Sequence, residues 1–216
     1  ALEKDNGPYI AVCPVNHTGD RHSPSAWKMT NAMPSWSWTG CEGQKASIEV
    51  YARAARVELW LNGRIIGRKA LKNDCFAKFS VTYEPGKLEA VSYDARGCEL
   101  GRCNLTTAGQ QTQITAGPEQ SSVQAGHLCY IRLRYTDEKG ITKPLARGNI
   151  KVEVDGGTLV GLGNACPYHE CSYLDCVADT YYGEALAIVR AGEGNSLTLA
   201  ADDGMHSTAV TVPVTR

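Results

Sequence analysis

Three cysteines and a histidine lie close together in the sequence and could ligate a metal. They are Cys166, His169, Cys171 and Cys176. Thiolates and imidazole suit zinc, which takes four such ligands in a tetrahedron. The segment lacks the paired Cys-x-x-Cys knuckles that typical zinc sites contain. We therefore expect no metal and no other cofactor, and these four residues are the candidate ligands if zinc is bound.

Two tryptophans form a second candidate site. Trp36 and Trp38 stand at i and i+2 in SWSWTG, so they lie on the same side of the chain if this segment is extended. Two neighbouring indoles could grip a sugar ring, because aromatic faces suit its apolar C–H surface. Large aromatic side chains are also buried between domains. The sequence leaves both interpretations open and favours the second.

Carboxylates are numerous, but none is expected to be catalytic. Acid/base hydrolysis needs two carboxylates that face each other across a cleft. The pattern instead places acidic residues singly on solvent faces (Glu49, Glu58, Glu153, Asp155) or in turns (Asp94, Asp137, Glu138, Asp202, Asp203). The chain also contains no Gly-x-Ser-x-Gly motif and no Gly-Lys-[Ser/Thr] phosphate loop.

The stretch that organises the chain runs from Ser47 to Gly67 and is predicted to form a β-hairpin. Asn-Gly at 62–63 is the dipeptide that accepts positive φ at both centres of a type I′ turn. Apolar and polar residues alternate before the turn, which predicts a strand with one core face. Trp60 falls on the face opposite Val57, Leu59 and Leu61. That face needs a partner domain or a ligand to cover its indole, so Trp60 is a third candidate residue.

Alternating strands recur about every ten residues along the rest of the chain, with Gly- and Pro-containing turns between them. The strands after the hairpin, up to about Thr107, are predicted to continue it as an antiparallel meander. Pro213 cannot donate a backbone hydrogen bond, so the last strand is expected at a sheet edge. We predict an all-β protein of two tandem immunoglobulin-like sandwiches. The first covers residues 1–107 with an irregular lead-in, and the second covers 108–216.

Composition excludes some functions. With 22 Lys and Arg against 23 Asp and Glu, the net charge of −1 gives no case for nucleic-acid binding. No apolar run approaches the roughly 20 residues that cross a bilayer. Nine cysteines cannot all pair, so reduced thiols and a cytoplasmic location are expected.

Several long stretches resemble the domains that follow the catalytic barrel in bacterial family 2 glycoside hydrolases of the β-galactosidase type. In the first half these are SWSWTGCEGQKASIEVYARAARVELWLNGRIIGRKAL and FSVTYEPGKLEAVSYDARGCELGRCNLTTAG. The second half contributes LVGLGNACPYHEC and YYGEALAIVRAG. The resemblance runs from about Tyr9 to the end. It implies two immunoglobulin-like sandwiches from a retaining exo-glycosidase whose catalytic glutamates lie on a barrel.

No catalytic residue carries over to this chain, because the family's acid/base lies in an Asn-Glu pair and no such dipeptide occurs here. A barrel also needs about 250 residues. The resemblance thus implies an accessory fragment that braces the barrel of the same polypeptide, shapes its substrate cleft, or supports homo-oligomer contacts. Two alternatives stay open. One is a module binding a galactoside or other oligosaccharide through Trp36 and Trp38, and the other is an adhesion-type tandem of immunoglobulin-like domains.

Overall fold

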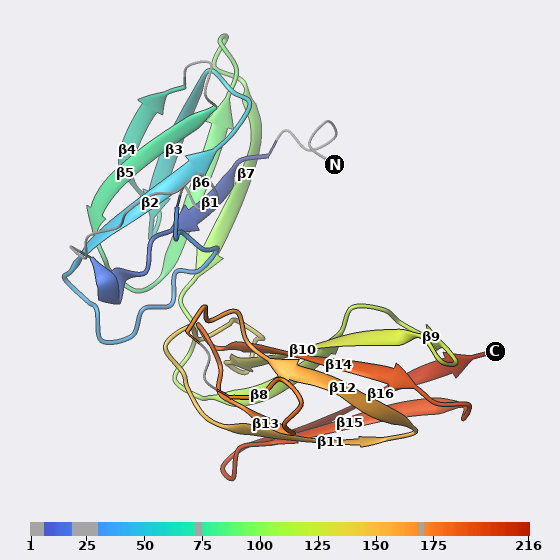
Figure 1. The fold of residues 1–216 in the computed structure, drawn as a ribbon. Coiled ribbons are helices and arrows are strands. Elements are labelled where there is room, and N and C mark those ends of the chain that lie inside the picture. Colours follow the sequence, from blue (N-terminus) through green and yellow to red (C-terminus); the bar gives the residue numbers. More distant parts are fainter. Residues whose placement is uncertain (1–6, 19–29, 72–74, 169–170) are drawn as a thin grey trace. The chain divides into compact units, whose positions relative to one another are not determined.

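The computed structural model describes residues 7–18, 30–71, 75–168 and 171–216. The chain divides into two compact units, Ala1–Thr107 and Ala108–Arg216. Apart from a 3-10 turn at Val15–His17, the described residues form strands and loops (Figure 1). The predicted all-β class is confirmed.

The first unit is a sandwich of two antiparallel sheets. One has the order β1-β2-β5 and the other the order β4-β3-β6-β7. The strands are β1 (Tyr9–Val12), β2 (Lys45–Tyr51), β3 (Arg56–Leu61), β4 (Arg64–Ala70), β5 (Phe76–Thr82), β6 (Lys87–Tyr93) and β7 (Glu99–Thr106). Alternate residues of β2, β3 and β6 point into the core, and Ile48, Leu59 and Leu88 are each 0% exposed.

The part of the predicted hairpin from Arg56 onward is β3–β4, and its turn has the predicted geometry. The start of the predicted stretch, from Ser47, instead belongs to β2 in the other sheet. Asn62 has φ 51° and Gly63 has φ 78°, the two positive values of a type I′ turn. The Asn62 side chain also accepts a hydrogen bond from the Lys87 backbone N–H (2.9 Å) and donates to the Pro85 carbonyl (3.0 Å). The turn is therefore fixed both by local conformation and by the neighbouring loop.

The predicted meander is wrong at β5, because the chain leaves the sheet after β4 and returns to it at β6. β5 pairs with β2, whereas β6 pairs with β3, so the chain changes sheets between them. The connecting residue Tyr83 is 0% exposed, and its backbone bonds to Gln44 and Gly43 rather than to a strand of the second sheet. The Pro85-Gly86 turn is thus a crossover between layers, which turn residues alone do not reveal.

The second unit is also a two-sheet sandwich, with sheet orders β12-β14-β10-β8 and β13-β11-β15-β16-β9. Its strands are β8 (Gln113–Pro118), β9 (Val123–Gln124), β10 (Leu128–Thr136), β11 (Ile150–Asp155), β12 (Gly157–Gly163), β13 (Val177–Ala178), β14 (Glu184–Ala191), β15 (Ser196–Asp202) and β16 (Ser207–Thr215). One hydrophobic core lies between the sheets and includes Ile131, Leu133, Val189, Leu197 and Leu199.

The final strand, β16, is a sheet edge as far as Pro213 and is covered on both sides only at its end. It pairs with β15 on one side, and Val214 and Thr215 pair in parallel with β9 on the other. Pro213 is accommodated because the pairing with β9 begins only after it, so no ladder bond needs a Pro213 N–H.

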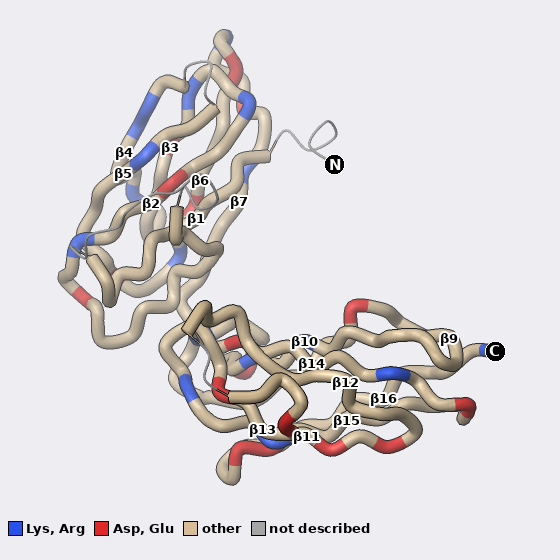
Figure 2. Tube along the Cα trace, viewed as in Figure 1, with Lys and Arg blue, Asp and Glu red and all other residues tan. Residues whose placement is uncertain are grey.

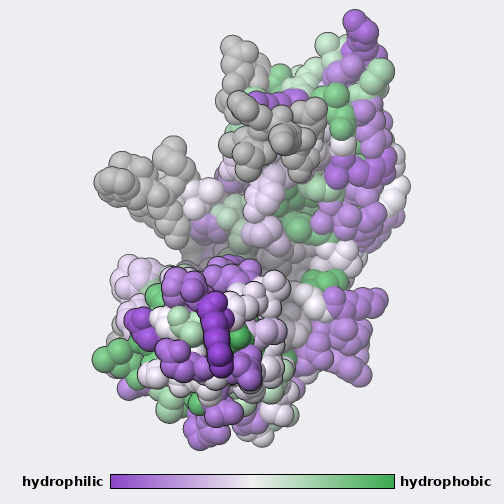
Figure 3. Space-filling view, turned by 90° about the vertical axis from the view of Figure 1, so that its right-hand side faces the viewer, coloured by the Kyte–Doolittle hydropathy of each residue, from purple (hydrophilic) through white to green (hydrophobic). Residues whose placement is uncertain are grey.

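Charges of both signs are interspersed over the two units, as Figure 2 shows. The face in Figure 3 is largely hydrophilic, with hydrophobic residues in small groups. The predicted exposure of the acidic residues is wrong at three positions: Glu49, Glu58 and Asp137 are 4%, 8% and 1% exposed. Each is buried because neighbouring polar groups bond to its carboxylate.

Candidate functional site

The outer face of the sheet β4-β3-β6-β7 is the candidate interaction surface, and we call it the Trp60 face. The alternation that buries Val57, Leu59 and Leu61 turns Glu58 and Trp60 outward from β3. In the register of β6 on β3, Trp60 lies opposite Glu89. The indole is only partly exposed, and its Nε1 is buried with no hydrogen-bond partner.

Glu58 is held by two neighbours on this face. Arg68 of β4 donates from Nε to its carboxylate at 2.9 Å, and the Tyr93 hydroxyl of β6 donates at 3.3 Å. The Arg56 guanidinium lies 4.6 Å from the centre of the Tyr93 ring. Burial raises the pKa of Tyr93, and the Glu58 carboxylate raises it further. The Glu58 side chain is therefore tied to β4 and to β6 by hydrogen bonds.

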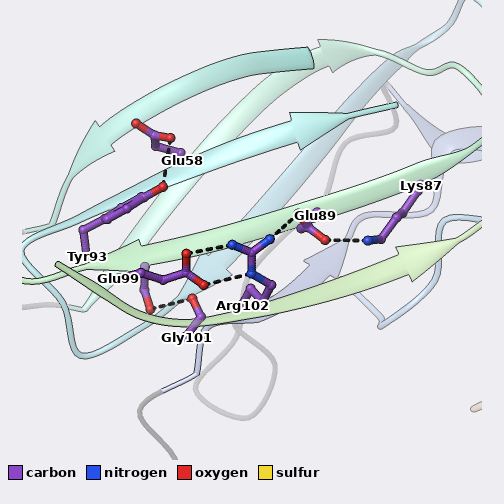
Figure 4. A network of polar contacts seen from close by, with 8 residues as sticks. Glu58, Lys87, Glu89, Tyr93, Glu99, Gly101 and Arg102 are labelled. Atoms are coloured by element: carbon purple, nitrogen blue, oxygen red, sulfur yellow. Dashed lines mark hydrogen bonds and ion pairs between the residues drawn. The ribbon is translucent and has the colours of Figure 1, made fainter. Parts of the chain in front are cut away.

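A second chain of ion pairs crosses β6 and β7 (Figure 4). Arg102 binds Glu99 through two parallel hydrogen bonds of 2.8 and 2.7 Å. It also reaches Glu89 at 3.3 Å, and Lys87 binds the other oxygen of Glu89 at 2.6 Å. Hydrogen bonding to Arg102 lowers the pKa of Glu99. Because these carboxylates are already paired with cations, the face suits recognition better than proton transfer.

The alternation in β3 correctly predicts that Trp60 points away from the core, but it does not predict which polar residues lie beside it. Glu89 and Tyr93 alternate in β6 with Leu88, Ala90 and Ser92, which are buried. That alternation could have shown that they point outward beside Trp60, had the pairing of β3 with β6 been known.

Trp36 and Trp38 do not present a sugar platform, because both are 0% exposed. The Trp36 indole donates to the Glu84 carbonyl (3.0 Å), and the Trp38 indole donates to the Ser35 carbonyl (3.3 Å). The Tyr83 ring lies edge-on to Trp36 at 4.8 Å, and its hydroxyl accepts the Trp38 backbone N–H at 2.9 Å. These indoles are part of the interior, with hydrogen-bond partners inside the first unit.

The candidate zinc ligands lie after β12 in the second unit. Cys166 is partly exposed, Cys171 and Cys176 are exposed, and His169 lies outside the described residues. Among the described residues, no cluster of three or more His, Cys, Asp or Glu side chains is arranged to hold a metal.

A polar cluster that the sequence did not indicate joins the β15–β16 turn to β10. The Tyr135 hydroxyl donates to Asp203 at 2.8 Å, and the His206 ring nitrogen Nδ1 lies 3.2 Å from the same oxygen. Burial would raise the pKa of Asp203, but these bonds and two backbone N–H donors hold it well below the usual range. The cluster fastens the turn, and its acid is fully committed to that role.

The structure thus defines a pair of β-sandwich units, the first of which has a polar outer sheet face. Residues 43–101 match the family described as a domain of unknown function, DUF4982. Residues 113–211 match the family described as glycoside hydrolase family 2 C-terminal domain 5. The chain therefore belongs to the C-terminal region of glycoside hydrolase family 2.

Solved structures agree with this assignment. A family 2 glycosyl hydrolase from Bacteroides cellulosilyticus is 29% identical, with a TM-score of 0.82, over 95% of this chain and 28% of its own. A β-glycosidase from Bacteroides vulgatus shares the fold, with a TM-score of 0.76 at 21% identity, over 99% of this chain and 25% of its own. The chain thus spans about a quarter of the length of these relatives.

A curated relative from Formosa agariphila, provisionally named a beta-glucuronidase, is 33% identical over 90 residues. The match covers 40% of this chain and 9% of that protein. These names support a glycosidase family but do not single out a β-galactosidase. Among the described residues, no helix has the length and apolar character needed to cross a membrane.

Proposed function

We propose that this chain is a non-catalytic accessory region that packs against the catalytic barrel of the same polypeptide through the Trp60 face. The observation that carries the proposal is the half-buried indole, whose Nε1 has no partner, amid paired charges of both signs. Interface cores favour Trp and Arg, and rims are polar. About seven tenths of the Bacteroides cellulosilyticus relative has no counterpart here, so ample chain is available to cover this face.

The proposed activity of the whole enzyme is hydrolysis of a β-glycoside by that barrel. The resemblance in the sequence favours a β-galactoside, whereas the name of the Formosa agariphila relative favours a β-glucuronide. Both chromogenic substrates should therefore be tested on the parent protein and on residues 1–216 alone. We expect turnover by the parent only. Turnover by residues 1–216 would contradict a non-catalytic role.

Docking is tested by mixing this chain with the separately produced remainder of the parent and measuring association by sedimentation. Trp60→Ala should weaken association about tenfold or more, as expected for a central interface tryptophan. Tyr9→Ala is the matched control, because Tyr9 is an aromatic residue 52% exposed on the other sheet of the same unit. Equal effects of the two variants would refute docking through the Trp60 face. Self-association of this chain lost in Trp60→Ala would instead assign the face to an oligomer contact.

A further inference from the structure

The second unit contains a pocket that neither family description assigns. It lies on the outer face of the sheet β12-β14-β10-β8 and has a volume of about 500 Å³. Tyr173 lies beside β12, because the Leu162 N–H donates to the Tyr173 carbonyl at 2.8 Å. The pocket thus has one wall from a loop and its floor from the sheet.

The floor is hollow and apolar for reasons visible in the sequence. Gly161 and Gly163 of β12 have no side chains, and a Cβ on Gly163 would lie only 2.3 Å from the Tyr173 ring. The ring therefore packs directly against the strand. In β14, Leu186 and Ile188 line the pocket, while the residues that alternate with them enter the core.

Polar groups stand around this floor. Arg132 of β10 lies 3.0 Å from Glu119 and 3.7 Å from Glu184. Besides Arg132 and Glu184, the polar lining residues are Asn164, Tyr173 and Tyr181. The pocket offers planar hydrogen-bond donors and acceptors beside apolar and aromatic surface.

We propose that this pocket binds a pyranoside ring of a saccharide. One face of such a ring is apolar C–H surface, which suits the tyrosines and the aliphatic floor, and its edge carries hydroxyls for Arg132 and Glu184. The volume is in the range of small-ligand sites. A phosphorylated ligand fits less well, because Glu119 and Glu184 already balance the charge of Arg132. A wholly apolar ligand would desolvate that ion pair without replacing its bonds.

The site is separate from the Trp60 face and does not depend on docking of a barrel. This pocket would place carbohydrate binding in the second unit, whereas the sequence suggested Trp36 and Trp38 of the first unit, which are buried. All four tryptophans precede residue 61, so tryptophan fluorescence does not report on this pocket directly. Amide NMR of the isotope-labelled full chain does, through the backbone N–H groups of Gly161, Gly163 and Leu186.

The probes are methyl β-D-galactopyranoside, methyl β-D-glucuronide and cellobiose, each titrated to about 20 mM, which detects millimolar affinity. At least one should shift the three pocket amides together. Arg132→Met and Tyr173→Ala should each weaken that binding about fivefold or more through lost hydrogen bonds or ring contact. The matched control is Tyr168→Ala, since Tyr168 is 87% exposed in the same loop and does not line the pocket.

The spectrum of each variant also shows whether the second unit stays folded. Shifts with the glucuronide alone would show that the pocket binds an anionic sugar. Shifts with the neutral sugars would show that it binds through the sugar hydroxyls. The proposal is overturned if no saccharide shifts the pocket amides, if the shifts lie elsewhere, or if folded Arg132→Met and Tyr173→Ala bind as tightly as the control.

Discussion

Asp137 should be among the most important polar residues for the stability of the second unit. Its side chain is buried, and its oxygens accept three backbone N–H groups, from Gly109 (2.7 Å), Lys139 (2.9 Å) and Ile141 (2.8 Å). The carboxylate thereby ties the start of the unit to the turn after β10. In Asp137→Asn the amide NH₂ must face one of these donors, which leaves at least one of the N–H groups unsatisfied.

A hydrogen bond to a charged group is worth about 1.5–3 kcal/mol, and a buried unsatisfied donor costs about 1–3 kcal/mol. We therefore expect Asp137→Asn to lower the free energy of unfolding of the second unit by about 2–3 kcal/mol, or its Tm by about 10 °C. Asp202→Asn is the control, because Asp202 is an exposed acid of the same unit that accepts one backbone N–H. It should cost about 0.5 kcal/mol or less.

The position of the tryptophans makes the assay specific. All four lie in the first unit, so tryptophan emission follows its unfolding, while circular dichroism follows both units. Asp137→Asn should shift the dichroism transition and leave the tryptophan transition in place. The reasoning is refuted if the variant is as stable as Asp202→Asn, or if only the tryptophan transition moves.

The effect of Asp137 should also depend on pH. Burial opposes ionisation, but the three backbone donors outweigh it and lower the pKa of Asp137. A lowered pKa in the folded state stabilises the fold above the ordinary Asp value of about 3.9, and this contribution is lost as the pH falls through the folded value. The stability difference between wild type and Asp137→Asn should therefore be full at neutral pH and shrink below about pH 4. A difference that grows in acid would contradict this sign.

Two further outcomes are expected. Tyr83→Phe removes the acceptor of the buried Trp38 N–H, so it should destabilise the first unit by about 1–3 kcal/mol in a denaturant titration followed by tryptophan emission; an unchanged midpoint would count against that bond. Burial raises the thiol pKa of Cys41 and Cys129, with a smaller contribution from Glu42 at Cys41. Both should react with Ellman's reagent only after unfolding, unlike the three exposed thiols, Cys98, Cys171 and Cys176, which should react at once.

Local patterns predicted the strands well because the information lies within a few residues. The Asn62-Gly63 turn needs only two positive φ values, and the strand before it needs only alternation. The sheet to which a strand belongs is a non-local property. The crossover at Tyr83 depends on hydrogen bonds to Gln44 and Gly43, some forty residues away, and no turn motif encodes them.

Burial of charged residues was harder to foresee for the same reason. Glu58 occupies an outward position in β3, so alternation alone predicts exposure. Its actual exposure is 8%, because Arg68 and Tyr93 from two other strands bond to it. A carboxylate surrounded by donors on paired strands becomes buried without leaving the outer face of the sheet.

The tryptophans show why residue type does not by itself locate a binding surface. Trp36 and Trp38 are fully buried and donate their indole N–H groups to carbonyls of the first unit. Trp60 is partly exposed, and its N–H donates to no acceptor. A buried donor without a partner costs about 1–3 kcal/mol, which a docking domain that rearranges the surrounding side chains can recover. Among these three indoles, only Trp60 therefore offers a free-energy reason to bind something else, and this is why the docking experiment centres on it.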